Sequence, residues 1–201
     1  GLNTGGMGAV SPVPFCTPEF LSKVEERIVK PTLEGLKAEE IDYKGFIFLG
    51  LMNDGGNPYV IEYNVRMGDP ETEAVMTRIE GDFVDLLGAC ADGRLNEVHY
   101  AQSDKTAVTV MMVSGGYPEA YEKGKVMNGL EGLKDVVAFH AGTSFNADNE
   151  VVTSGGRVIA VTAHGNTIEE ARDLAYREVE KIHFEGANYR HDIGLDLMKL
   201  Q

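Results

Sequence analysis

The sequence has little of what several common classes of protein require. Only two cysteines, Cys16 and Cys90, occur in 201 residues. They are too few and too scattered for a disulfide framework or a zinc site, and we interpret them as thiols in a reducing cytoplasm. The apolar runs at residues 46–52 and 108–113 are far shorter than a membrane span of about 20 residues, and no basic-then-apolar leader opens the chain. These features predict a cytoplasmic protein without a membrane partner.

Basic residues are also scarce. The chain has 18 Lys and Arg against 32 Asp and Glu, and its formal net charge is −14. A nucleic-acid surface needs a basic patch, so we predict no nucleic-acid partner. Small anions are not excluded, because backbone amides and one or two arginines can bind a phosphate locally. A hydrophobic fraction of 43% is typical of a globular chain of one large or two small domains.

Several kinds of catalytic machinery are absent as well. The five histidines show no metal-ligand spacing, and neither a Gly-x-Ser-x-Gly elbow nor a Cys–His signature indicates a covalent nucleophile. The most informative stretch that is present, residues 59–66, alternates apolar with polar side chains as a half-buried strand does. We expect one face of this strand to pack on the core; it carries Tyr59, Ile61, Tyr63 and Val65.

The other face of this predicted strand carries Glu62, Asn64 and Arg66. Neighbours on one face lie about 6.5–7 Å apart along a strand. A carboxylate and an amide oxygen at this spacing could therefore converge on one hard cation, with a guanidinium just beyond. A strand whose polar face is merely solvated is the alternative.

A glycine-rich loop begins the chain. Its polar and glycine residues are Asn3, Thr4, Gly5, Gly6 and Gly8. Such a loop can fold round an anion, since glycine accepts positive φ and lets N–H groups point inward. It lacks the Lys-Ser/Thr ending of a phosphate loop and does not follow a strand as a dinucleotide fingerprint would. A flexible linker is the alternative.

The remaining pattern predicts an α+β chain. A helix begins after Thr17 and is kinked or split at Pro31; residues 45–52 and 59–65 form a hairpin; helices follow at residues 71–80 and between Asp82 and Gly93. Residues 96–105 are polar and irregular, a candidate domain boundary. Beyond them we predict strands at residues 107–113, 136–140, 151–152 and 157–163, and a helix from Thr167 to about His183.

Five short segments of the chain resemble motifs that occur in the same order in the glycinamide ribonucleotide synthetases (phosphoribosylamine–glycine ligases) of the ATP-grasp superfamily. They are residues 3–8, 61–72, 114–118, 139–143 and 153–158. The resemblance covers essentially the whole chain. It implies that residues 1–98 are the C-terminal part of an ATP-grasp domain, mostly antiparallel sheet with helices. Residues 106–201 would be a small mixed β/α C-terminal domain. The N-terminal half of the enzyme, including its nucleotide lid, would be a partner that this chain lacks.

The resemblance also implies a reaction. ATP phosphorylates glycine, and 5-phosphoribosylamine attacks the glycyl phosphate, giving glycinamide ribonucleotide, ADP and phosphate in the second step of de novo purine biosynthesis. By the same resemblance, Glu62 and Asn64 ligate Mg²⁺ or Mn²⁺, and Arg66 stabilises the transferring phosphoryl group. No acid occurs in residues 46–52, where several ATP-grasp relatives carry a further metal ligand, so a second metal is not expected from this strand.

Further site residues follow from the resemblance alone. Asp69 and Glu71 would hold glycine or the amine, with Asp69 taken as catalytic. The loop of Asn3, Thr4, Gly5, Gly6 and Gly8 would contact phosphoribosylamine or the acyl group, and Arg157 would be a substrate contact. A simple helix cap at Asp69 and a surface ion pair at Arg157 are the alternatives.

Two other functions stay open. One is another ATP-grasp carboxylate–amine ligase or carboxylase with a different acceptor, against which the motifs at residues 68–71 and 115–118 argue. The other is a non-catalytic binding module. Without the nucleotide lid, we expect this chain to be inactive alone.

Overall fold

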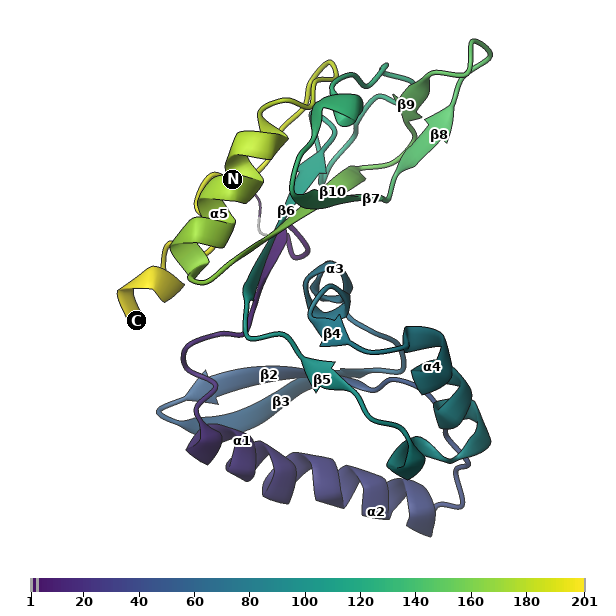
Figure 1. Ribbon diagram of the computed structural model, residues 1–201, viewed down its shortest axis with the longest axis vertical. Helices are drawn as coiled ribbons and strands as arrows, with labels where there is room; N and C mark the ends of the chain where they lie inside the picture. The colour runs from purple at the N-terminus through teal and green to yellow at the C-terminus, as the bar shows by residue number, and fades with distance from the viewer. Residues whose placement is uncertain (1, 3, 201) are drawn as a thin grey trace. The chain divides into compact units, whose positions relative to one another are not determined.

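The computed structural model describes residue 2 and residues 4–200, which belong to two units (Figure 1). Unit 1 comprises residues 1–12, 69–78 and 103–201, and unit 2 comprises residues 13–68 and 79–102. The domains expected from the sequence are residues 1–98 and 106–201. The structure instead groups residues 1–12 and 69–78 with residues 103–201 in unit 1. Both units combine helices with antiparallel strands, so the predicted α+β class is confirmed.

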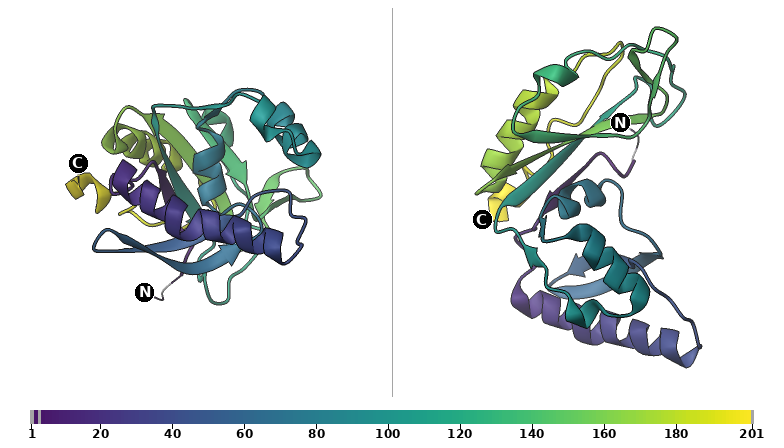
Figure 2. Two further views of the ribbon diagram at one scale, coloured as in Figure 1. Left: turned by 90° about the horizontal axis from the view of Figure 1, so that it is seen from below. Right: turned by 45° about the vertical axis from the view of Figure 1, so that its right-hand side comes forward.

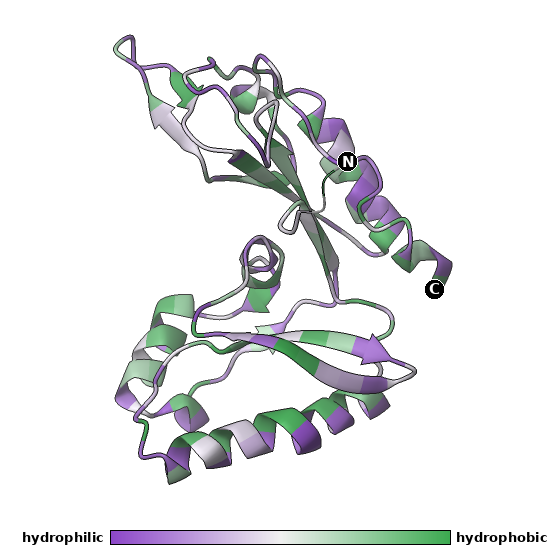
Figure 3. Ribbon diagram, turned by 180° about the vertical axis from the view of Figure 1, so that it is seen from behind, coloured by the Kyte–Doolittle hydropathy of each residue, from purple (hydrophilic) through white to green (hydrophobic). Residues whose placement is uncertain are grey.

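A four-stranded antiparallel sheet forms the centre of unit 1. In spatial order its strands are β1 (Gly8–Ser11), β6 (Thr106–Val113), β10 (Arg157–Gly165) and β7 (Val136–His140). Every residue of β6 is buried, so both faces of the sheet are covered there. The hydroxyls of Thr109 and Thr162 satisfy each other at 2.8 Å inside this core. Figure 3 shows the apolar character of these central strands.

The helix α5 (Ile168–Val179) lies along this sheet (Figure 1). As predicted, Thr167 caps it, accepting a hydrogen bond from the amide of Glu170 at 3.1 Å. Its buried stripe consists of Ile168, Ala171, Ala175 and Val179. The helix stops at Val179, not near His183, because His183 exchanges backbone hydrogen bonds with Asn128, which a helical residue could not do.

Short elements complete unit 1. They are α3 (Glu71–Met76), β8 (Thr143–Phe145), β9 (Val151–Thr153), η3 (Leu130–Gly132) and η4 (Leu197–Leu200). The helix predicted over residues 71–80 is therefore too long. Arg78 ends it by donating to the carbonyls of Ser103 and Lys105 and to the hydroxyl of Ser11, each at 2.8 Å. These three bonds tie α3 to the rest of the unit.

Unit 2 consists of a long helix, a hairpin and smaller elements (Figure 2). They are α1 (Pro18–Val24), η1 (Glu25–Val29), α2 (Lys30–Ala38), β2 (Phe48–Asp54), β3 (Asn57–Asn64), β4 (Ile79–Glu80), α4 (Phe83–Asp92), η2 (Leu95–Glu97) and β5 (Ala101–Gln102). Thr17 and Asp82 cap α1 and α4 as predicted. The break expected at Pro31 takes the form of a π-helical turn just before it, because proline cannot supply the usual amide.

The hairpin departs from simple alternation. Glu62 pairs with Gly50 and Val60 with Leu51, so Ile61 is an extra residue that forms a β-bulge. On the N-terminal side of the bulge, the residues of β3 therefore switch faces. Tyr59 lies on the same face as Glu62, and Val60 lies on the opposite face. The predicted apolar face is also wrong as a core face. Its residues Tyr59, Ile61, Tyr63 and Val65 are exposed, since in the described residues the sheet here has only two strands.

None of the helices in the described part of the chain has the length and apolarity that a membrane span requires.

Candidate functional site

Two of the predicted ligands lie side by side in unit 2. The amide Nδ2 of Asn64 donates to Oε1 of Glu62 at 3.0 Å, so both side chains share one face of β3 near its end. Gly50 on β2 makes room for this arrangement. A Cβ atom on Gly50 would lie 2.9 Å from Cγ of Glu62, so the carboxylate side chain crosses the neighbouring strand directly over the glycine.

This pair suits a hard divalent cation. A carboxylate and an amide carbonyl are oxygen ligands, and an amide rotated by 180° would present Oδ1 of Asn64 beside Glu62. Among the described residues, no group of three or more His, Cys, Asp or Glu side chains could hold a metal ion. A magnesium ion on Glu62 and Asn64 would therefore take its other ligands from water and phosphate, which is its usual behaviour in ATP sites.

Arg66 follows the end of β3 in the same unit. Its Nη1 donates to the carbonyl of Met67 at 2.8 Å, and the side chain is exposed. Of the three predicted polar-face residues, the structure thus joins Glu62 and Asn64 directly, and it leaves Arg66 at the exit of the strand.

The other predicted residues belong to unit 1. Arg157, the first residue of β10, donates from Nη2 to the carboxylate of Asp69 at 2.6 Å and from Nη1 to its carbonyl at 3.0 Å. Asp69 is no helix cap, because Pro70 occupies the N-cap of α3 without a side-chain cap bond. Arg157 thus pairs with an acid that is half exposed, as the alternative of a surface ion pair expects, and Arg157 itself is half-buried.

The glycine-rich loop packs against this ion pair. Gly6 has a φ of +77°, and a Cβ atom there would lie 2.3 Å from Nη1 of Arg157. Gly8, in β1, would place a Cβ atom 2.8 Å from both Thr109 O and Ile193 Cδ1. The close approach that these glycines allow is therefore to the protein itself. No other described residue comes within 4 Å of a Cβ atom on Gly5, and Thr4 donates to Gly5 O at 3.3 Å. Asn3 lies outside the described residues.

The first turn of α3 carries Glu71 and one acid that sequence reasoning missed. Oε2 of Glu73 is buried, and within the described residues no hydrogen-bond partner reaches it. Burial raises the pKa of the Glu73 carboxyl, and the negative charges of Asp69 and Glu71 add to this, whereas Arg157 opposes it. The only sequence signal for Glu73 is its place in the turn after the Gly-Asp-Pro segment.

Unit 1 also contains a cavity of about 490 Å³ that borders the loop. Thr4 and Met7 of the loop line it, together with Tyr117 from the segment after β6 and with Asn188 and Arg190 near the end of the chain. No motif in the sequence pointed to Asn188 or Arg190.

Two family models match the chain. Residues 1–72 match the ATP-grasp (A) domain of phosphoribosylglycinamide synthetase, and residues 107–196 match its C domain. Curated relatives named phosphoribosylamine–glycine ligase include that of Chlorobaculum tepidum, 48% identical over 200 residues, and that of Caldanaerobacter subterraneus, 47% identical over 194. Each alignment covers 96% of this chain and 46% of the relative, so the chain spans about half the length of the curated relatives it matches.

Solved structures of related proteins are also similar to this chain. The crystal structure of phosphoribosylamine–glycine ligase from Thermotoga maritima superimposes with a TM-score of 0.84 at 42% identity, over 96% of this chain and 47% of that one. The biotin carboxylase domain of 2-oxoglutarate carboxylase from Hydrogenobacter thermophilus, in complex with MgADP, ADP and bicarbonate, gives a TM-score of 0.59 at 15% identity, over 96% of this chain and 46% of that one. The second likeness is one of fold alone.

Proposed function

Because the chain belongs to the phosphoribosylglycinamide synthetase family, we propose that it supplies part of an ATP-dependent ligase joining glycine to 5-phosphoribosylamine. The reaction passes through glycyl phosphate and yields glycinamide ribonucleotide, ADP and phosphate, in the second step of purine biosynthesis. The proposal concerns the whole ligase, of which this chain matches about half. The observation that carries it is the adjacency of Glu62 and Asn64 at the end of β3.

The reaction brings two anions together, since a carboxylate attacks a triphosphate. A site for it must neutralise charge before it can orient the reactants. Glu62 and Asn64 would hold a Mg²⁺ or Mn²⁺ ion, which when bound neutralises the phosphates of ATP. Arg66, exposed just beyond them, offers a planar guanidinium to the transferring phosphoryl group.

Unit 1 supplies the second set of proposed site residues. Arg157 and Asp69 hold each other in place, and Arg157 in turn packs against Gly6. In this proposal Asp69 and Glu71 orient glycine or the amine, while the loop of Asn3, Thr4, Gly5, Gly6 and Gly8 contacts phosphoribosylamine or the acyl group. Arg157 contributes as a substrate contact and by fixing Asp69.

A cytoplasmic location forms part of the same proposal. The two cysteines are both free thiols, which is the usual state in a reducing compartment. Neither a ligase with another acceptor nor a binding module is favoured by a specific observation among the described residues.

The test is an assay of the full-length protein for ADP release that requires both glycine and phosphoribosylamine. We expect release only when both are present, with glycinamide ribonucleotide formed in equal amount. ADP release with a different carboxylate or amine, and none with this pair, would assign the chain to another ligase.

A further inference from the structure

The cavity in unit 1 has the size and lining of a small-molecule site. Its volume of about 490 Å³ lies in the range of ligand pockets, about 300–1,000 Å³. Met7, Val113 and Tyr117 give it apolar walls, and Thr4, Asn188 and Arg190 add polar groups. An apolar wall with a few placed polar groups is the usual arrangement in sites for small organic molecules.

Among the described residues that line this cavity, Arg190 is the only cation, in a chain whose net charge is −14. Its Nε and Nη2 donate to the two carboxylate oxygens of Asp192 at 2.8 and 2.6 Å. These bonds hold the pKa of Asp192 below its usual range and fix the plane of the guanidinium. Nη1 makes no hydrogen bond within the described part of the chain and can donate to an anion, for which arginine is well suited.

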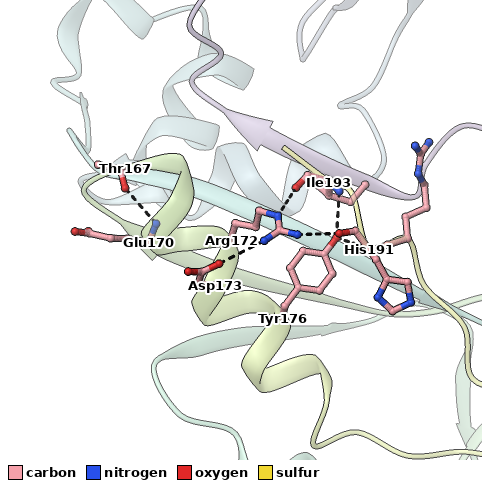
Figure 4. Close-up of polar contacts among 8 residues, drawn as sticks. Thr167, Glu170, Arg172, Asp173, Tyr176, His191 and Ile193 are labelled. Carbon is pink, nitrogen blue, oxygen red and sulfur yellow. Dashed lines mark hydrogen bonds and ion pairs between the residues drawn. The ribbon is translucent and has the colours of Figure 1, made fainter. Parts of the chain in front are cut away.

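The backbone of this segment is also held in place (Figure 4). The hydroxyl of Tyr176 donates to Arg190 O at 2.6 Å and accepts from the amide of Ile193 at 3.1 Å. Arg172 stacks on the Tyr176 ring, 4.6 Å from its centroid, and donates to the carbonyls of His191 and Ile193 at 2.8 and 3.1 Å. Both side chains come from α5, so the helix presents Arg190 in one arrangement.

Asn188 is anchored in a similar way. It exchanges two backbone hydrogen bonds with Val113 at the end of β6, at 2.8 and 3.0 Å. The two polar residues from the end of the chain are therefore both tied to the central elements of unit 1. A pre-organised site loses less entropy on binding than a loop that must first be ordered.

We propose that this cavity binds the phosphate of a phosphorylated sugar, with Arg190 as its principal phosphate ligand. Thr4 and Asn188 donate further hydrogen bonds, and Met7 and Tyr117 contact the sugar carbons. The inference rests on the proposed function, whose amine substrate is a phosphorylated ribose. It adds Asn188 and Arg190 to the substrate-binding residues.

The test measures binding to the full chain by isothermal titration calorimetry, with ribose 5-phosphate, ribose and inorganic phosphate as probes. We expect ribose 5-phosphate to bind more tightly than either of the others. Arg190→Gln should weaken it about ten- to a hundredfold, the loss typical of a charged hydrogen-bonding group. Arg190→Lys, which keeps the charge but loses the fork, should give an intermediate loss.

The matched control is Arg177→Gln, the same charge change at an exposed arginine of α5. It should bind ribose 5-phosphate as the parent does, and unfolding curves of all three variants should show that they are folded. Equal binding by Arg190→Gln and the parent would overturn the inference. So would a failure of ribose 5-phosphate to bind the parent, or inorganic phosphate binding just as tightly as the sugar phosphate.

The assay of the full-length protein separates this inference from the proposed function. If ribose 5-phosphate binds in a way that depends on Arg190 but the full-length protein has no ligase activity, the phosphate site in the cavity is supported and the proposed ligase function is contradicted. Ligase activity whose KM for phosphoribosylamine is unchanged in Arg190→Gln would support the ligase and overturn the site.

Discussion

The guanidinium of Arg157 donates to the carboxylate of Asp69 at 2.6 Å, although the two residues are 88 positions apart in the chain. This pair joins the start of β10 to the turn before α3, and Gly6 leaves the space that the guanidinium fills. Three of the residues expected from sequence to contact substrate therefore form one packed group in unit 1.

The Asp69–Arg157 pair should contribute modestly to stability. Asp69 is half exposed, so a double-mutant cycle of Asp69→Asn and Arg157→Gln should give a coupling energy of about 0.5–1 kcal/mol in urea unfolding. The exposed pair Arg94–Glu97 is the control, with a coupling near zero. No coupling between Asp69 and Arg157 would show that the pair does not persist in solution.

Gly6→Ala should destabilise the protein. The new methyl group would meet the Arg157 guanidinium, and a φ of +77° costs a non-glycine residue about 1–2 kcal/mol. Gly5→Ala is a close control in the same loop, since a Cβ atom there meets none of the described residues within 4 Å, and its effect should stay within about 0.5 kcal/mol. Thermal unfolding measures both, and equal melting temperatures would contradict the packing of Gly6 on Arg157.

If the proposed metal site is correct, Glu62→Gln should weaken metal binding in the full-length protein. Removal of one of the two proposed protein ligands should raise the Mg²⁺ concentration for half-maximal activity about tenfold or more, and excess metal should partly restore activity. Asp54→Asn, the same change at an exposed acid at the other end of the hairpin, is the control and should leave the metal dependence as it is. An unaltered Mg²⁺ dependence in Glu62→Gln would remove Glu62 from the metal site.

The Glu73 carboxyl should make stability depend on pH. Because burial raises its pKa in the folded state, the folded protein binds this proton more tightly than the unfolded chain does. The contribution of this carboxyl to the free energy of unfolding is therefore fully present below the pKa of the unfolded chain, and it is lost as pH rises through the pKa of the folded protein. Glu73→Gln should remove this loss and be more stable relative to the parent at pH 7 than at pH 4.

Urea unfolding at several pH values measures this effect. Glu119→Gln, at an exposed acid of unit 1, is the control and should follow the parent across the range. A Glu73→Gln variant that parallels the parent at every pH would show that this carboxyl is not perturbed in solution.

Features that depend on neighbours in the chain were predicted well. The caps at Thr17, Asp82 and Thr167 follow from short-range hydrogen bonds to amides three residues on. The adjacency of Glu62 and Asn64 follows from the period of two in a strand. Features that depend on register were not predicted: the bulge at Ile61 is set by the pairing with β2, and it exchanges the faces of Tyr59 and Val60.

The sequence by itself determined the α+β class, the helix caps and the polar pair on β3, because each rests on contacts within a few residues or on a short period. Only the tertiary structure decided that residues 1–12 and 69–78 belong with the C-terminal sheet. It also decided that Arg157 meets Asp69, that Oε2 of Glu73 is buried, and that Arg190 lines a cavity. These depend on which distant segments pack together, and that is settled by the burial of the whole sheet and its helices.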